Sequence, residues 1–478
     1  MATEDLIKAY GEYLDSLNIH VLRNVARRVG VYKPTDGKKE NLIERTISVL
    51  IGVVPPVPPS NRGAPIKDDT LDPKYMRRLE QIREEYTLRG NAPFFENTAG
   101  VRSGDVPQHD YDKPLRMGVL ELLPNGSGML RAENCRSAAD RDVFVSESAV
   151  HDFALREGDY VVCTVSMRTE NNAPVLEKVL SVNERTDYRG RGRFDEFAAA
   201  YPEEKIELSA GNACLLLRCV DLFAPIGKGQ RVSVHAPSSA EADLFLREVA
   251  SAVRAHADRG ENLHLLTLLV DCRPEDAAEF ECCLSDGALY AAQDFAYTTF
   301  DMDAQEHVRA AKLIFARAAR LAEMGENAVV LVNSLTRLTL AADALCDAGK
   351  KLSCGLSVAA FHIPKTFFSI ARKLRDGGSI TVIAAVDGGT GAESVIREEF
   401  DRFANCRIEL CGQGTGARLD PEKSGTLRAE SLLSAEETAC VRRLRPAVTD
   451  GGRDVCRAMA QTPDNAAFVA AVNGGKTE

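Results

Sequence analysis

The sequence predicts a multidomain α/β protein in which a small helical unit and a β-barrel precede a core built on a parallel sheet. Between residues 206 and 410, continuously apolar strands alternate with amphipathic helices, as in a parallel sheet covered on both faces. Short alternating strands separated by turn residues fill residues 117–182, which predicts a small closed barrel. Apolar residues recur at helical spacing in the first 52 residues.

Composition limits the protein class. The chain has 478 residues, enough for about three domains, and is 45% hydrophobic, which excludes wholesale disorder. Its net charge of −11 argues against coating nucleic acid through overall charge, so a nucleic-acid site would have to be local. The 13 cysteines show no C-x-x-C spacing and are expected to be reduced structural thiols. The start MATEDLIKAY and the lack of an apolar run of about 20 residues predict a cytoplasmic protein without membrane contact.

Residues 1–52 are predicted to form the helical unit. One helix carries Leu22, Val25, Ala26 and Val29 and stops at Gly30, and a second repeats the pattern at Ile43, Ile47 and Leu50. Its basic residues, offset by nearby acids, suit either a nucleic-acid contact or a solvated face: Arg27, Arg28, Lys38 and Lys39.

A linker is predicted at 53–113. The Val-Val-Pro-Pro-Val-Pro-Pro run at 53–59 cannot propagate a helix, and one helix is expected around Pro73–Leu88. We expect this segment to connect the helical unit to the barrel and to have no catalytic role.

Residues 114–186 are predicted to form a barrel of the oligonucleotide-binding, cold-shock-like type. The expected strands are Gly118–Leu123, Gly128–Arg131, Asp142–Ser146, Asp159–Val165 and Leu176–Val182. Such barrels stack bases on aromatic side chains above a basic rim. The two positions for those aromatics hold Ser127 and Met129, which leaves Phe144 and Arg131 as RNA-binding candidates. Because each stacked base contributes roughly 1–3 kcal/mol, RNA binding is expected to be weak.

The core is predicted over 187–435, closed by C-terminal helices over 436–478. Its expected strands are Val232–His235, Leu263–Val270, Ala328–Val332, Ile380–Val386 and Arg407–Leu410, and its expected helices include Leu244–His256, His307–Glu323 and Thr366–Leu374. In the C-terminal part, Thr462-Pro463-Asp464 is a signal for the start of a helix.

The segment Gly227–Leu244 has the layout of a phosphate-binding loop. A strand over Arg231–His235 is expected to lead into a tight loop and then a helix from about Asp243. In nucleotide-binding domains this place holds G-x-x-x-x-G-K-[ST], whose backbone N–H groups and lysine bind phosphates. Here Glu241 replaces the second glycine, Ala242 the lysine and Asp243 the Ser/Thr. The full degenerate loop is Ala236, Pro237, Ser238, Ser239, Ala240, Glu241, Ala242 and Asp243.

In order and spacing, a set of short motifs resembles the bacterial transcription termination factor Rho family. These motifs include Ala224-Pro-Ile-Gly-Lys-Gly-Gln-Arg231, Asp271-Cys-Arg-Pro-Glu275, Asn333-Ser-Leu-Thr-Arg-Leu338, His362-Ile-Pro-Lys365 and Ser424-Gly-Thr426. The resemblance implies a RecA-type P-loop core in a hexameric, RNA-dependent ATPase and helicase that uses ATP and Mg²⁺. It also implies single-stranded RNA and RNA polymerase as partners.

The departures from the family fall on its working residues. The resemblance implies an Asp that supports Mg²⁺ where Asn333 stands, and a Glu that activates water where Cys272 stands. The adenine-stacking aromatic is replaced by Gly416, and the arginine finger by Leu427, with Arg428 one position late. In the RNA-contacting loops, Gly391 replaces a lysine, whereas Lys350 and Lys351 keep their charge.

Together these changes predict that ATP and Mg²⁺ are not cofactors of this chain. Against the family's Gly-Lys-Ser/Thr, the run Glu241, Ala242, Asp243 adds two negative charges and removes one positive charge, a change of three units. At about 4 Å and an effective dielectric of 20, each pair of unit charges interacts by roughly 4 kcal/mol. Phosphoryl transfer depends on cations around the phosphate oxygens, so such a pocket should repel ATP.

The favoured interpretation is a Rho-like protein with a degenerate ATP site that binds RNA weakly and modulates a functional Rho or RNA polymerase, with a homo- or hetero-hexamer as its expected assembly. One alternative is a functional ATP-dependent RNA helicase and terminator with a non-standard site. A second is a structural module that has lost both RNA and ATP binding.

Overall fold

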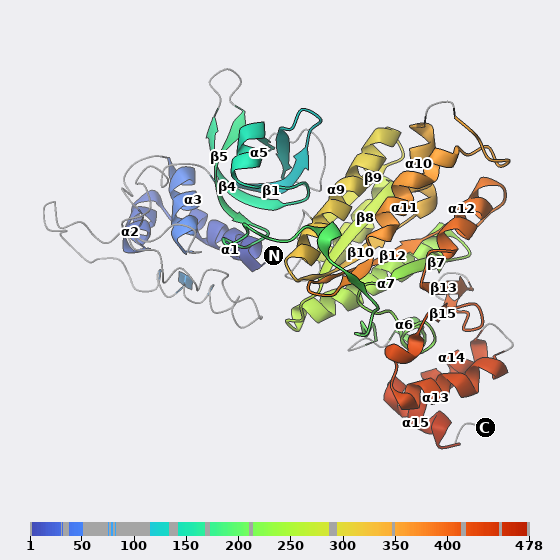
Figure 1. Cartoon of the computed structure of the whole chain (residues 1–478). Coiled ribbons are helices and arrows are strands. Elements are labelled where there is room, and N and C mark those ends of the chain that lie inside the picture. The colour runs from blue at the N-terminus through green and yellow to red at the C-terminus, as the bar shows by residue number, and fades with distance from the viewer. Residues whose placement is uncertain are drawn as a thin grey trace, which may run out of the picture.

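The computed structural model describes residues 2–29, 31, 38–50, 75, 78–79, 82, 115–132, 142–167, 173–209, 214–285, 294–346, 349–412, 417–448 and 452–475. Most of the predicted linker therefore lies outside the described residues, and so does Gly416. Figure 1 shows the N-terminal helices and the barrel on one side of the sheet core, with the last helices at its far end.

Three helices form the N-terminal unit: α1 (Ala2–Ser16), α2 (Ile19–Val29) and α3 (Lys39–Leu50). The side chain of Asn18 caps α2 by accepting hydrogen bonds from the backbone N–H groups of His20 and Val21. Leu79 and Ile82 are helical and pack against the core of this unit, and the Tyr13 hydroxyl donates to the Tyr75 carbonyl at 3.1 Å. The helix expected around Pro73–Leu88 is thus present at the few positions described there.

The barrel closes in the order β1-β2-β3-β5-β4. Its strands are β1 (Leu115–Leu122), β2 (Gly128–Arg131), β3 (Val143–Val145), β4 (Tyr160–Met167) and β5 (Pro174–Val182). Alternate residues such as Leu120, Leu130 and Val161 fill its interior. The predicted barrel is confirmed. A short helix that was not predicted, α5 (Glu147–Asp152), follows β3 and is capped by the Ser146 hydroxyl.

The core is one sheet with the main order β14-β13-β7-β12-β10-β8-β9. Every neighbouring pair from β13 to β9 is parallel. The strands are β6 (Ala199–Ala200), β7 (Arg231–His235), β8 (His264–Cys272), β9 (Phe295–Thr299), β10 (Asn327–Val332), β11 (Arg372–Leu374), β12 (Ser379–Ala385), β13 (Cys406–Cys411), β14 (Arg418–Leu419) and β15 (Gly425–Thr426). The predicted fold class is confirmed.

Helices cover both faces of this sheet, and alternate residues of each strand point to opposite faces. In β10, Val329 and Leu331 join one apolar cluster while Val330 and Val332 join the other. The first cluster is covered by α6 (Leu215–Phe223), α7 (Ser239–Asp258), α8 (Pro274–Ser285), α13 (Ala435–Leu444), α14 (Arg453–Ala460) and α15 (Asn465–Asn473). The second is covered by α9 (Ala304–Glu323), α10 (Leu335–Ala344), α11 (His362–Ser369) and α12 (Ala392–Asp401).

The core differs from what the sequence predicted in three places. The helix expected over Thr366–Leu374 ends at Ser369, and Arg372–Leu374 forms β11, because its backbone pairs with β12 and β6. Strand β9 was not predicted. Helix α7 begins at Ser239 rather than near Asp243, so much of the predicted loop is the first helical turn. The helix start at Asp464 is confirmed, since its side chain accepts from the Ala467 N–H at 2.7 Å.

The barrel packs on helix α9 of the core. A Cβ atom at Gly158 would lie 2.3 Å from the Ala316 carbonyl carbon, so only glycine allows this close approach. Arg317 donates to the Asn183 side chain at 2.7 Å, and Arg309 pairs with Glu121 at 3.0 Å. These buried contacts fix the barrel on the core.

None of the described helices is long and apolar enough to cross a membrane.

Candidate nucleotide and RNA sites

The degenerate phosphate loop connects β7 to α7 at the carboxyl end of the parallel sheet, where α/β proteins bind ligands. Helix α7 starts at Ser239, and its first turn carries Glu241, which is buried and accepts a hydrogen bond from the Ser238 hydroxyl. A helix N-terminus attracts anions through its free N–H groups and dipole. Here the chain's own carboxylate lies at that end, in the place where a phosphate would bind.

Four of the sequence-predicted positions, Ala240 of the loop among them, meet at one cavity. Asp243 from α7, Cys272 from the end of β8 and Asn333 after β10 all line a space of about 210 Å³. Its other lining residues are Ala240, Leu244, Arg247, Leu269, Asp276, Glu279 and Phe280. The tertiary structure therefore brings to one cavity residues from segments about 30 to 60 positions apart.

Asn333 uses its side-chain amide to bridge two strands. Its Oδ1 accepts from the Val270 N–H at 2.7 Å, and its Nδ2 donates to the Val270 carbonyl at 3.1 Å. The side chain is 5% exposed. An amide engaged on both sides in this way is a poor ligand for a hydrated Mg²⁺, which favours carboxylates.

Cys272 is buried at the position where the family would place a water-activating glutamate. Burial, with a smaller effect from Asp276, raises the pKa of its thiol to about 12. The thiol is therefore protonated at neutral pH and is neither a base nor a nucleophile. Among the described residues that line the cavity, none is a histidine that could activate it.

Asp243 brings a carboxyl group to the same cavity. Burial raises the pKa of Asp243 to about 6, and the negative charges of Asp276 and Asp387 add to this effect, while Arg337 and Arg247 oppose it. Arg337 is held nearby because it donates to the Asp271 carbonyl at 2.9 Å. In the described part of the chain, no three or more His, Cys, Asp or Glu side chains are grouped to hold a metal ion. These residues do not fit Mg²⁺-bound ATP.

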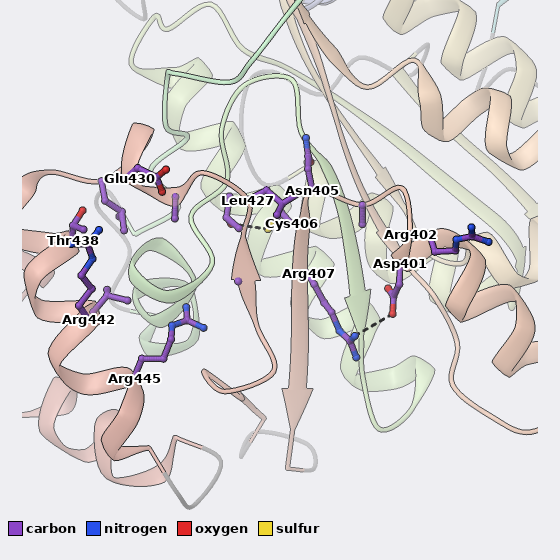
Figure 2. A pocket seen from close by; sticks show the side chains of 16 residues that line it. Asp401, Arg402, Asn405, Cys406, Arg407, Leu427, Glu430, Thr438, Arg442 and Arg445 are labelled. Carbon is purple, nitrogen blue, oxygen red and sulfur yellow. Dashed lines mark hydrogen bonds and ion pairs between the residues drawn. The ribbon is translucent and has the colours of Figure 1, made fainter.

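Leu427 and Arg428 occupy the region of the expected arginine finger. Leu427 is 69% exposed and lines a groove of about 600 Å³ between β13, β15 and α13, as Figure 2 shows. Arg428 has a left-handed backbone with φ 58°, and its guanidinium stacks on the Tyr201 ring at 3.7 Å. Arg428 is not a lining residue of this groove, and its cation is already engaged.

That groove contains arginines, but most of their guanidinium groups are occupied. Arg407 pairs with Asp401 at 3.3 Å (Figure 2). Arg445 donates to the carbonyls of Pro421, Ser424 and Phe223. The groove thus presents a mixed charged and apolar surface beside Leu427, and its paired arginines do not resemble an arginine finger.

The two loops expected to contact RNA differ in charge. Lys350 and Lys351 are both exposed. Gly391 is exposed, has φ 68° and precedes α12, and no atom lies within 4 Å of where its Cβ would be. A larger side chain would have space there but would strain the backbone.

Strands β2 and β3 carry three of the predicted RNA-binding positions or their neighbours. Met129 lies opposite Phe144 in the β2–β3 pairing, and both side chains are half-buried. Ser127 is 5% exposed, and its hydroxyl is within 2.7 Å of Asn125 Oδ1. Phe144 is thus the aromatic that remains among the candidate positions.

Arg131 differs from the rim cation that the sequence led us to expect. Its guanidinium is buried and bonded to two carboxylates, Glu121 at 2.6 Å and Asp142 at 2.7 Å. Since Glu121 also pairs with Arg309 of α9, Arg131 holds the barrel strands together and connects them to the core. It does not offer an exposed charge to RNA.

Several cavity residues were missed at the sequence level. Asp276, Glu279 and Phe280 all line the cavity from α8, and Glu279 pairs there with Arg247. Their spacing of three and four residues places them on one helix face, a signal that the sequence contained.

Comparison with known proteins gives consistent matches. Residues 116–187 match the family described as "Rho termination factor, RNA-binding domain". The transcription termination factor Rho of Streptomyces coelicolor is 35% identical over 367 residues, which cover 74% of this chain and 84% of that protein. Rho of Aquifex aeolicus is 35% identical, covering 67% and 74%, and Rho of Bacillus subtilis is 32% identical, covering 74% and 84%.

Two solved structures are also similar. One is described as a prototypical ATPase from the type III secretion system of pathogenic bacteria; it is 16% identical, with a TM-score of 0.46, covering 64% of this chain and 93% of that one. The other is described as a unique ATP synthase subunit from Nanoarcheaum equitans; it is 13% identical, with a TM-score of 0.46, covering 59% and 79%.

Proposed function

Since this chain belongs to the transcription termination factor Rho family, we propose that it is a member that does not hydrolyse ATP and acts by binding. It has the family's RNA-binding domain and a parallel-sheet core of the RecA type. The proposed role is to bind RNA weakly and to modulate a functional Rho or RNA polymerase.

The single observation that carries this proposal is the pairing of Asn333 with Val270. In the family this position supports the metal through a carboxylate. Here both polar atoms of the side chain are engaged by the neighbouring strand in two hydrogen bonds, and the position offers no carboxylate to support a metal. The asparagine that replaces the carboxylate therefore takes part in the hydrogen bonding between neighbouring strands of the sheet.

The electrostatics of the loop support the same conclusion. Glu241 lies in the first turn of α7 and Asp243 lines the cavity, so both add negative charge to the loop, and Ala242 supplies no cation. The buried thiol of Cys272 cannot accept a proton from water. Loss of the metal support, the base and the phosphate-binding lysine together removes the groups on which phosphoryl transfer depends.

Weak RNA binding is supported by the barrel. Phe144 and Met129 offer one aromatic and one thioether surface side by side, and Arg131 is withdrawn into ion pairs. Exposed Lys350 and Lys351 supply charge in the core. The chain therefore keeps part of the surface for base stacking and part of the positive charge for phosphate contacts.

A functional Rho is the partner we propose first, through insertion of this chain into its ring. Sites shared between neighbouring subunits become inactive when one side lacks its catalytic groups. The exposed Leu427 would place an apolar side chain where the neighbour's site needs an arginine. Such a subunit would lower the activity of the mixed ring.

The test is binding of a fluorescent ATP analogue with Mg²⁺, with and without pyrimidine-rich single-stranded RNA, followed by phosphate release on the same sample. An intact Rho serves as the positive control. We expect no binding at millimolar nucleotide and no phosphate release. RNA-stimulated release would contradict the proposal and support a helicase with a non-standard site.

The partner is tested separately by adding this chain to an intact Rho and measuring its RNA-stimulated ATPase. A progressive loss of activity supports the mixed ring. Unchanged activity together with co-purification of RNA polymerase would move the proposal to the polymerase.

A further inference from the structure

Two cysteines that are far apart in the sequence touch in the folded protein. The Sγ atoms of Cys219 in α6 and Cys456 in α14 are 3.8 Å apart, although 237 positions separate the two residues. The Cys219 Sγ also lies 3.4 Å from the Met459 Sδ, one turn further along α14. α6 and α14 therefore meet through a small sulfur cluster.

Hydrogen bonds beside the cluster hold the two helices in register. Arg218, next to Cys219, donates to the carbonyls of Met459 and Thr462 at 3.1 and 2.8 Å, and to the Thr462 hydroxyl at 2.9 Å. Its Nε donates to Asn465 Oδ1, and the Asn465 amide donates back to the Arg218 carbonyl, both at 3.1 Å. This clamp keeps the thiols facing each other without a covalent link, which raises their effective concentration toward one another.

The two thiols differ in accessibility. Cys219 is 1% exposed, whereas Cys456 is half-buried. The contact with Cys456, together with burial, raises the pKa of the Cys219 thiol well above its ordinary value. Cys456 is therefore the group that a reagent reaches first, and Cys219 is shielded until its neighbour has reacted.

We propose that Cys219 and Cys456 form a reversible disulfide that fastens α14 to α6 when the chain meets a low-molecular-weight disulfide. In the first step the Cys456 thiolate attacks the disulfide RSSR, forming Cys456–S–S–R and releasing one thiol, RSH. In the second step Cys219 gives up its proton and attacks the Cys456 sulfur, which releases the second RSH. The two protein thiols are oxidised, and one RSSR is reduced to two RSH.

The geometry permits this bond with small movements. A disulfide requires an S–S length of about 2 Å and Cβ atoms about 4 Å apart. Two thiols already in contact on packed helices approach this arrangement by rotation about χ1. The alternative soft-metal site is less well supported, because among the described residues no three or more His, Cys, Asp or Glu side chains are grouped to hold a metal ion.

The bond would fix the C-terminal helices on the core. α13, which with α14 and α15 forms this helical end, supplies Thr438, Val441 and Arg442 to the groove beside Leu427. Oxidation would therefore rigidify one wall of that groove. This inference is independent of whether ATP is hydrolysed.

The test uses the full chain, incubated with excess oxidised glutathione and then alkylated, with intact mass and peptide mapping as readouts. We expect the loss of two hydrogens, a peptide that links Cys219 to Cys456, and faster migration on a non-reducing gel that dithiothreitol reverses. The oxidised protein should unfold several degrees higher, since the link constrains a long loop of the unfolded chain.

Variants make the assignment specific. Cys219→Ser should stop at a mixed disulfide on Cys456, and Cys456→Ser should prevent the link entirely. Cys346→Ser is the matched control, because the thiol of this half-buried cysteine donates to the Ala342 carbonyl in the last turn of α10, and the variant should behave as the original chain does. A link from Cys456 to Cys411 or Cys214, or glutathione retained on Cys456 of the unaltered chain, would overturn the proposal.

Discussion

The side-chain amide of Asn333 is hydrogen bonded to both backbone groups of Val270, accepting from the N–H at 2.7 Å and donating to the carbonyl at 3.1 Å. These two side-chain hydrogen bonds connect the end of β10 to β8 at the carboxyl end of the sheet. They explain why the residue at a metal-supporting position of the family contributes to stability in this chain.

Replacement Asn333→Asp should destabilise the fold without restoring activity. The carboxylate keeps the acceptor for the Val270 N–H but faces the Val270 carbonyl with an oxygen that cannot donate. We expect the free energy of unfolding in urea to fall by about 1–3 kcal/mol at neutral pH. The control Asn473→Asp alters an exposed amide that donates to the Glu436 carbonyl, and it should change stability by less than about 0.5 kcal/mol. A gain of ATP hydrolysis in Asn333→Asp would contradict our account of the site.

The Asp243 carboxyl should make stability fall as pH rises from about 4 to about 6. Its pKa is about 6 in the folded state, above the ordinary value of 3.8, so the folded state binds the proton more tightly. The contribution is fully present below pH 3.8 and is lost as pH rises through 6.

Asp243→Asn removes that dependence. Relative to the original chain, the variant should be more stable at pH 8 by about 1–2 kcal/mol and nearly equal at pH 4, as measured by urea unfolding across pH. Equal stability differences at both pH values would show that the carboxyl does not titrate as described.

Arg131→Met should strongly destabilise the barrel. Arg131 is buried between Glu121 and Asp142, and removing it leaves buried Asp142 without this cation and Glu121 paired with Arg309 alone. Breaking such a buried pair costs about 3–5 kcal/mol, which thermal or urea unfolding should detect. Arg402→Met is the matched control, because that side chain is 73% exposed and pairs with Glu399 at 3.5 Å; its cost should stay below about 1 kcal/mol. Similar effects from both variants would refute the structural role of Arg131.

Aromatic substitutions at Met129 and Ser127, the two positions that lack the expected aromatic side chain, should have different effects. Met129 is half-buried beside Phe144, so Met129→Phe should add a stacking surface and tighten binding of pyrimidine-rich RNA by about 1–3 kcal/mol. Ser127 is buried against Asn125, so Ser127→Phe should lower thermal stability through overpacking instead. Fluorescence anisotropy and thermal unfolding give the two readouts. Unchanged RNA affinity in a folded Met129→Phe variant would place the RNA elsewhere.

Local patterns predicted most of the fold, because each depends on neighbouring residues. The apolar runs at β7, β8, β10, β12 and β13 identified the buried parallel strands, and turn residues separated the barrel strands. The pattern failed at Arg372–Leu374, where the sheet edge provided backbone partners that outweighed a helical periodicity. It also missed β9.

The candidate nucleotide site was predicted only as a set of positions. The substitutions at Glu241, Ala242, Asp243, Cys272 and Asn333 are read directly from the residues, and the sequence alone gave their change in charge. It could not show that the Asn333 side chain is hydrogen bonded to Val270, or that Arg131 forms ion pairs with two carboxylates. These facts depend on which side chains lie across from each other.

The sequence by itself determined the family and the layers of the fold, since these follow from residue type, order and spacing along the chain, and it predicted the loss of the charges that hold ATP. Only the tertiary structure decided which groups became partners. It placed Asp243, Cys272 and Asn333 around one cavity, and it brought Cys219 against Cys456 across 237 positions. Contacts of this kind arise from the packing of helices and strands, and short-range patterns do not contain them.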